Sequence, residues 1–158
     1  MLQKITAKKG AARGGNYAII ASKYNAVYVD SLLRAAKSEI RRAGGKLQIV
    51  RVPGAYEIPV VAARLARLSA SDSRFSAIIC LGVILRGATT HAQHIGEAVS
   101  NALSQIQIQH EIPVIHEVLL LENHHQARER CLDKKHNRGR EAAQTAIEMA
   151  HVMSGLRR

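Results

Sequence analysis

Short apolar runs alternate with segments of helical periodicity along most of this chain, and this alternation restricts the fold more than any other sequence feature. Four runs are predicted to be strands, namely NYAIIAS (16–22), KLQIVRV (46–52), FSAIICLGVIL (75–85) and PVIHEVLLL (113–121). Five helices are predicted between and after them, at about 30–43, 57–68, 91–109, 123–132 and 140–153. Asp30 and Asn123 are the expected N-cap residues of the first and fourth helices.

This order of elements indicates a parallel sheet, because parallel strands are joined by helices that cover both faces of the sheet. We therefore predict an α/β protein with a three-layer α/β/α fold and a flavodoxin-like, four-stranded parallel sheet of order 2-1-3-4. A chain of 158 residues is suited to one domain with a full core. We expect that domain at 16–158, preceded by a flexible basic tail at 1–15 that has no usable periodicity.

The composition excludes several classes of protein. A hydrophobic fraction of 47% with a charged fraction of 22% is typical of a folded domain and not of a disordered chain. No run approaches the roughly 20 apolar residues of a membrane span. The N-terminal segment lacks the apolar core of a secretory signal, so we predict a cytoplasmic protein. Cys80 and Cys131 form no CxxC pattern, and neither a disulfide framework nor a zinc site is expected.

The net charge of +11 favours anionic ligands or polyanions. The basic residues are spread over several segments, however, and aromatic residues make up only 3% of the chain, so no stacking platform for single-stranded nucleic acid is visible. We do not expect nucleic acid as a partner. A basic α/β protein that binds a polyanion through its Arg and Lys clusters is nevertheless kept as an alternative.

The segment RGATTH (86–91) lies where the third strand gives way to a helix. Ligands of parallel sheets bind at the carboxyl ends of the strands, so this loop is in the right place for a site. Gly87, Ala88 and Thr89 can present backbone N–H groups to an anion such as phosphate, and His91 can transfer protons near neutral pH. A capped helix start, with threonine as N-cap and a surface histidine, is an equally good interpretation of this loop considered alone.

Other chemical motifs are weaker or missing. Glu57, in the segment VPGAYEIP (52–59), is expected in the first turn of a helix, where an acidic residue is favourable in any case. His91 and His94 have helical spacing, but no third ligand stands at a familiar distance, so no metal site is expected. The dinucleotide and P-loop motifs are absent.

Taken together, several separated motifs resemble those of the lumazine synthase (6,7-dimethyl-8-ribityllumazine synthase) family. They occur in the correct order over about 16–153 and are SKYN (22–25), VPGAYEIP (52–59), LGVILRGATTH (81–91) and the run from Glu122 to Ala150. The resemblance implies a transferase that condenses 5-amino-6-(ribitylamino)uracil with 3,4-dihydroxy-2-butanone 4-phosphate, releasing phosphate and water, in the penultimate step of riboflavin biosynthesis. It implies no cofactor. It also implies a homopentamer, or a multiple of pentamers, whose site lies between adjacent subunits, and it makes riboflavin synthase a candidate partner.

The resemblance also implies roles for individual residues. Tyr24 matches an aromatic residue that stacks on the pyrimidine, and Asn25 follows it as in the family. The segment that holds the ribityl chain matches Ala55, Tyr56 and Glu57. The segment that lines the pyrimidine matches Val83, Ile84 and Leu85.

The phosphate site of the family matches Gly87, Ala88, Thr89 and Arg130. His91 matches the proton-transfer residue. Arg138 matches a position that is usually Lys and that a neighbouring chain contributes near the site.

The sequence departs from the family pattern mainly in the fourth predicted strand. His116 stands where an aromatic residue, often Phe, closes one wall of the pyrimidine pocket, and Glu117 stands where Gly is common. Leu120 and Leu121 replace a usual Thr-Thr pair. These changes support a second alternative, a catalytically weak protein of the same fold that binds lumazine or flavin as a carrier or shell.

Overall fold

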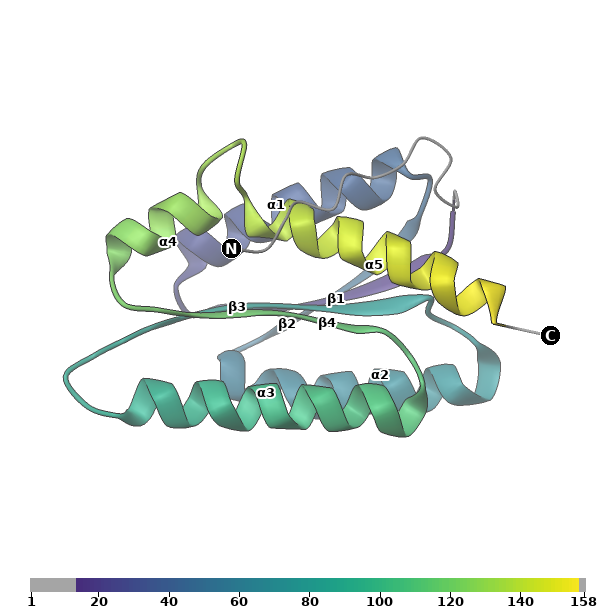
Figure 1. The fold of residues 1–158 in the computed structure, drawn as a ribbon, viewed down its shortest axis with the longest axis horizontal. Coiled ribbons are helices and arrows are strands. Elements are labelled where there is room, and N and C mark those ends of the chain that lie inside the picture. The colour runs from purple at the N-terminus through teal and green to yellow at the C-terminus, as the bar shows by residue number, and fades with distance from the viewer. Residues whose placement is uncertain (1–13, 157–158) are drawn as a thin grey trace.

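The computed structural model describes residues 14–156, which fold into one parallel sheet between two layers of helices (Figure 1). The strands are β1 (Asn16–Ser22), β2 (Lys46–Val52), β3 (Ala77–Leu85) and β4 (Val114–Leu121). The helices are α1 (Ala26–Arg42), the 3-10 turn η1 (Ala55–Glu57), α2 (Ile58–Asp72), α3 (His91–His110), α4 (His124–Cys131) and α5 (Arg138–Gly155).

The sheet confirms the predicted fold class and strand order. All three strand pairs are parallel and the order is β2-β1-β3-β4. The centre of the sheet is formed by β1 and β3, where Ile19 pairs with Ile49 on one side and with Ile79 on the other. Parallel pairing brings the carboxyl ends of the strands to one edge, so the loops that follow them can share a site.

Each face of the sheet has its own apolar core. Helices α1, α4 and α5 cover one face, and α2 and α3 cover the other (Figure 1). Because alternate residues of a strand point to opposite faces, Ile19 and Ile79 enter the first core while Ile20 and Cys80 enter the second. Burial on both faces explains why β1 and β3 read as continuous apolar runs and not as alternating ones.

The start of α1 corrects one expectation. The helix begins at Ala26 and not at Asp30. Asn25, the residue before it, has a left-handed backbone with φ 57°, and Tyr28 and Val29 in the first turn are buried. Those residues have weak intrinsic helix propensity, so packing decides their conformation. Asp30 lies inside the helix and forms an ion pair of 2.9 Å with Arg51 of β2.

Further boundaries differ from the predictions, and α2 continues to Asp72 and does not end near residue 68. The last helix begins at Arg138 and not near residue 140, because Asn137 is its N-cap and accepts a hydrogen bond from the backbone N–H of Gly139 at 2.8 Å. The 3-10 turn η1 precedes α2 and was not expected. The predicted N-terminal tail lies outside the described residues except for Gly14 and Gly15, which are hydrogen-bonded to Ala43 and Lys46.

Candidate active site

The carboxyl ends of β1 and β2 form the first half of a polar rim. The backbone N–H of Tyr24 donates to the carbonyl of Pro53 at 3.0 Å, which joins the two loops. The ring of Tyr24 lies against Gly54, where an added Cβ would be 2.8 Å from the ring edge. A side chain at this position would displace the tyrosine ring, and the Pro53–Gly54 turn signal was the one indication of this contact in the sequence.

Glu57 and Asn25 complete this half of the rim. The carboxylate of Glu57 accepts a hydrogen bond from the backbone N–H of Gly54 at 2.9 Å, which fixes the turn before α2. The side-chain amide of Asn25 donates to the carbonyl of Val83 at 2.8 Å and so joins the end of β1 to β3. Tyr24, Asn25, Glu57 and the end of β3 are thus brought together, as expected for residues of one site.

Arg51 holds this rim in place, although sequence reasoning did not single it out. Its guanidinium donates to the carbonyls of Ala21 and Ser22 at 3.2 and 3.0 Å, and it also pairs with Asp30 of α1. These bonds join the end of β2 to the end of β1 and to α1. The signal in the sequence was a charged residue near the end of a predicted strand.

Two tyrosines of the rim are exposed to an unusual degree for large side chains. Tyr24 and Tyr56 are 68% and 62% exposed, whereas Ala55, between them in the site, is buried. Val83 is buried as well, while Ile84 and Leu85 are half-buried and point to opposite faces of the sheet. Exposed aromatic rings beside polar groups are suited to contact with a planar ligand or a partner surface.

The loop after β3 supplies the second half of the rim. Gly87, Ala88 and Thr89 are exposed, and so is His91, the first residue of α3. Thr90 stands at the N-cap position, but its hydroxyl contacts His94 at 3.3 Å and accepts no backbone hydrogen bond of the kind that caps a helix. The N–H of His91 reaches the hydroxyl of Thr89 at 3.4 Å, and no other side-chain cap is found among the described residues, so the next N–H groups of this 20-residue helix are left open to an anion.

The same loop is tied to β4 through Arg86. Its backbone N–H donates to the carbonyl of Leu121 at 2.8 Å, and its side chain forms an ion pair of 3.0 Å with Glu122. Arg86 thus fixes the loop and points to a carboxylate, while the backbone groups of the following residues remain free.

Three of the predicted site residues lie on β4 or on the helices that follow it, and not on the loops of this rim. His116 pairs in register with Cys80, five positions before Leu121 at the end of β4. At about 3.3 Å per residue this places it roughly 16 Å from the rim along the strand. Arg130 is exposed on α4, and Arg138 begins α5, both on the sheet face opposite α3 (Figure 1).

His116 has both ring nitrogens occupied within the chain. Its Nδ1 accepts from the backbone N–H of Val118 at 3.1 Å, so Nδ1 carries no proton. Its Nε2, which must then be protonated, lies 2.7 Å from the hydroxyl of Ser100, which in turn donates to the carbonyl of Gly96 at 2.8 Å. Although the residue is partly exposed, its ring therefore braces β4 against α3 in the neutral form, and burial lowers its pKa.

This geometry predicts a pH dependence of stability. Because the folded pKa of His116 lies below its ordinary value of 6.5, its contribution to the free energy of unfolding is complete above that value and is lost as the pH falls through the folded pKa. We expect His116→Gln to lose less stability than wild type when urea unfolding is compared between about pH 8 and about pH 5. Equal losses in the two proteins would contradict the assignment.

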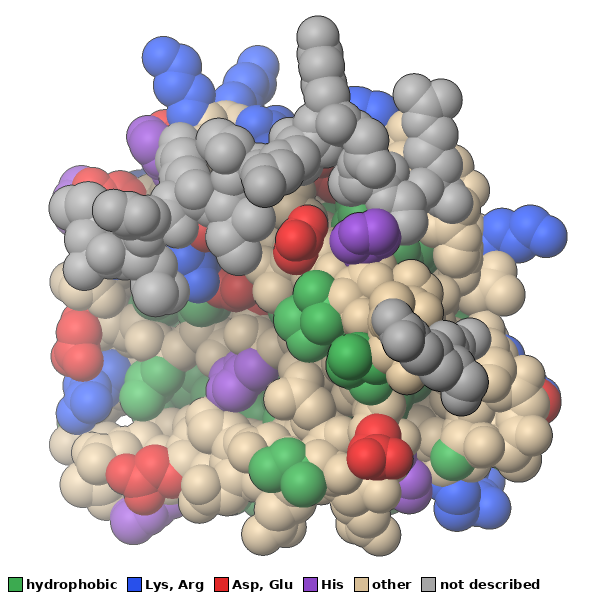
Figure 2. All heavy atoms as spheres, turned by 45° about the vertical axis from the view of Figure 1, so that its right-hand side comes forward, with side chains coloured by type: hydrophobic (Ala, Val, Ile, Leu, Met, Phe, Trp, Pro, Cys, Tyr) green, Lys and Arg blue, Asp and Glu red, His purple; other side chains and the backbone are tan. Residues whose placement is uncertain are grey.

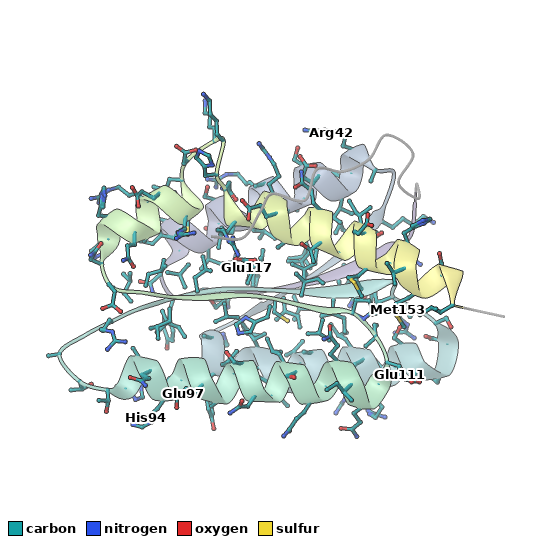
Figure 3. The ribbon with its side chains drawn as sticks, in the orientation of Figure 1. Arg42, His94, Glu97, Glu111, Glu117 and Met153 are labelled. Atoms are coloured by element: carbon teal, nitrogen blue, oxygen red, sulfur yellow. The ribbon has the colours of Figure 1, made fainter. Side chains whose placement is uncertain are left out.

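Arg138 is bound between two carboxylates. Its Nε donates to Glu117 at 2.7 Å and its Nη1 donates to Glu141 at 2.8 Å. Glu117 points from β4 toward the layer of α1, α4 and α5, as Figure 3 shows, and only 5% of the residue is exposed. Burial raises the pKa of the Glu117 carboxyl, because desolvation outweighs the hydrogen bond and the positive charge of Arg138.

Basic side chains form no single patch on the face drawn in Figure 2. Outside the grey residues, Lys and Arg side chains stand apart around the margin of that face, and Asp and Glu lie between them. A nucleic-acid interface usually concentrates its positive charge in one patch or stripe. The face drawn in Figure 2 therefore gives no support to the polyanion-binding alternative.

Two further kinds of site are absent from residues 14–156. No three His, Cys, Asp or Glu side chains in that range lie close enough to hold a metal ion. None of its helices is long and apolar enough to span a membrane.

Fold and site together define a flavodoxin-like α/β protein in which aromatic and carboxylate side chains and the start of a long helix lie at the carboxyl edge of the sheet. A model of the 6,7-dimethyl-8-ribityllumazine synthase family matches residues 14–154 of the chain. The match covers nearly all of the described residues, and the chain belongs to this family.

Proposed function

We propose that this protein is a 6,7-dimethyl-8-ribityllumazine synthase, a transferase that needs no cofactor. It condenses 5-amino-6-(ribitylamino)uracil with 3,4-dihydroxy-2-butanone 4-phosphate and releases phosphate and water. The observation that carries the proposal is the pairing, at one rim, of an uncapped helix N-terminus beside His91 with the Tyr24–Glu57 cluster. One half is suited to a phosphorylated substrate and the other to a planar, hydroxylated one.

The phosphate binds to the loop after β3. Backbone N–H groups of Gly87, Ala88 and Thr89 and of the first turn of α3 donate to its oxygens, aided by the positive end of the helix dipole. Arg130 adds a charged donor. Hydrogen bonds from charged groups are stronger than neutral ones, so this residue carries much of the affinity.

The pyrimidine binds beside the exposed ring of Tyr24, which stacks on it. The ribityl hydroxyls are held by the segment Ala55–Glu57, where the Glu57 carboxylate and turn backbone provide acceptors and donors. Backbone groups of Val83, Ile84 and Leu85 border the ring. Asn25 fixes the distance between these strands through its bond to Val83.

A complete site requires a second copy of the chain. Within one chain His116 lies on β4 away from the rim, and Arg130 and Arg138 lie on the helices that follow this strand. A neighbouring subunit whose β4 edge packs against the rim supplies these residues, and exposed Val27 and Val60 at the rim are suited to that contact. We propose a cytoplasmic homopentamer arranged in this way.

Proton transfer is the chemical task of the site. The substrate amine attacks the ketone carbonyl and water leaves to give an imine. Phosphate is then eliminated, the resulting enol tautomerises to a ketone, and the second nitrogen attacks this new carbonyl and closes the ring with loss of a second water. Each step moves a proton at nitrogen, carbon or oxygen, and His91, at the start of α3 beside the phosphate loop, is placed to carry it. Binding the two substrates side by side in the correct orientation lowers the barrier by more than proton transfer does, because effective molarity can be worth about 7–11 kcal/mol.

The test is a direct assay with a substitution at Arg130. Purified protein should accelerate lumazine formation from the two substrates above the uncatalysed background, followed by absorbance and fluorescence. Arg130→Ala should raise KM for the butanone phosphate about tenfold to a hundredfold, the loss expected for charged hydrogen bonds of about 1.5–3 kcal/mol.

Arg128→Ala is the matched control, since it removes another exposed arginine from the same helix. It should change this KM by less than about twofold. Absence of acceleration by folded wild-type protein would overturn the proposed reaction, and binding of lumazine and flavin would then test the carrier alternative.

A further inference from the structure

Two carboxylates hold the guanidinium group of Arg138 in one orientation. One ion pair would be enough to join β4 to α5. Glu117 and Arg138 are both largely buried, with 6% and 22% of their side chains exposed, and their 2.7 Å contact uses the guanidinium Nε. Nη1 is held by Glu141 at 2.8 Å. The planar guanidinium is thereby fixed at two of its three nitrogens.

The third nitrogen is left for another group. A guanidinium has five N–H donors in a rigid fork, and among the described residues neither a hydrogen bond nor an ion pair engages Nη2. With Nε and Nη1 held, the direction of the Nη2 donors follows from the two carboxylates. Glu117 therefore decides where Arg138 can donate.

The charges around Arg138 determine what it can bind. Two carboxylates contact this one cation, so its positive charge is compensated within the chain. Arg130 acts on Glu117 only through its charge and has no carboxylate contact among the described residues. A phosphate dianion will favour Arg130, whereas the compensated Arg138 is suited to uncharged oxygen acceptors such as carbonyl and hydroxyl groups.

We propose that Glu117 is a positioning residue that orients Arg138 toward the uncharged pyrimidine substrate, so that the pair sets affinity for this substrate and not for the phosphorylated one. This inference rests on the proposed function and on delivery of Arg138 to a neighbouring subunit. It also gives a reason for Glu117, which departs from the glycine common at this position of the family. The carboxylate and the arginine then act as a unit.

The test measures KM for each substrate separately in Arg138→Ala, in Glu117→Gln and in the double variant. Arg138→Ala should raise KM for 5-amino-6-(ribitylamino)uracil about tenfold, the loss typical of hydrogen bonds from a charged donor, and change KM for the butanone phosphate less than about twofold. Glu117→Gln should shift the same KM in the same direction by a smaller factor. In the Arg138→Ala background Glu117→Gln should add nothing, because its effect passes through the arginine.

Glu39→Gln is the matched control for loss of a buried carboxylate. Glu39 of α1 is 9% exposed and pairs with Arg42 of α1 and with Arg140 of α5, and it has no hydrogen bond or ion pair with Arg138. It should lower thermal stability without changing either KM. Arg138→Lys keeps the positive charge but not the planar guanidinium, so it should recover part of the affinity that Arg138→Ala loses. It also provides a second variant at this position in case Arg138→Ala does not fold.

Three outcomes would overturn the inference: an equal rise of both KM values, an unchanged pyrimidine KM in Arg138→Ala, or a full effect of Glu117→Gln in the absence of Arg138. Inactivity of the wild-type protein would instead overturn the proposed function. In that case the pair is judged by titration of the protein with 5-amino-6-(ribitylamino)uracil alone. The Kd must still rise about tenfold in Arg138→Ala for the inference to stand.

Discussion

His91→Ala should lower kcat about a hundredfold or more, the range typical for loss of a general acid–base residue, while measurable turnover remains. The imidazole lies exposed at the start of α3, beside the loop proposed to hold the phosphate, so it can reach the reacting atoms without a change of backbone. Removing it leaves the phosphate loop, Tyr24 and Glu57 in place. KM for both substrates should therefore change much less than kcat.

Residual activity is expected because positioning of the two substrates does not depend on the imidazole. Effective molarity alone can be worth about 7–11 kcal/mol, more than the contribution of one proton-transfer group. The measurement is steady-state lumazine formation by wild type and His91→Ala, with circular dichroism to verify folding. Undetectable turnover by a variant that folds and binds both substrates would contradict the claim that substrate positioning contributes more to the rate than His91.

His94→Ala is the control for the first prediction. His94 is exposed on the same helix one turn later, and its ring contacts Thr90 and not the loop Gly87–Thr89. Its removal should leave kcat within about twofold of wild type, as for most surface substitutions. A loss equal to that of His91→Ala would show that the catalytic histidine has been misassigned.

Gly139→Ala should destabilise the protein by about 3 kcal/mol or more, at the upper end of the range for overpacked cores. Gly139 lies in the first turn of α5, where a Cβ would overlap the carbonyl oxygen of Leu32 in α1 and would lie 2.6 Å from its carbonyl carbon. These are backbone atoms in the middle of a helix and cannot move aside alone. To admit a methyl group, α5 would have to shift away from α1 along a buried interface.

Such a loss is large against a typical total stability of about 5–15 kcal/mol, so much of the protein will be unfolded near its working temperature. Urea unfolding of purified proteins measures the change. Gly155→Ala is the matched control, because it makes the same substitution at the other end of α5, where nothing lies within 4 Å of the added Cβ. It should be neutral or stabilising by up to about 1 kcal/mol, and equal stability of the two variants would contradict the packing argument.

Much of the candidate site followed from the sequence for a physical reason. The position of a loop in a parallel sheet is fixed once the strand before it is known, so the loop Gly87–Thr89, His91 and Glu57 could be assigned to the carboxyl edge from the apolar runs alone. In the structure these residues do lie in the loops and helix starts that follow the carboxyl ends of β2 and β3. The structure adds what no periodicity encodes, namely that the α3 N-terminus is uncapped and that Tyr24 rests on Gly54.

The residues of the β4 edge could not be placed in this way. His116 and Glu117 are consecutive in the strand and therefore point to opposite faces, one to Ser100 and the other to Arg138. Their partners are 16 and 21 residues away in the chain, so only folding brings them together. The same holds for Asp30, a plausible cap by its type, which pairs instead with Arg51 across the space between α1 and β2.

By itself the sequence determined the strands, the layered class of fold and the edge at which a ligand would bind, because periodicity of burial and the chirality of parallel connections act locally along the chain. The tertiary structure alone decided where α1 begins, why Gly139 must be a glycine and which charges Arg138 meets. Those features depend on distances between segments far apart in the chain, and they are set when the two cores pack and not by the residues on either side of them.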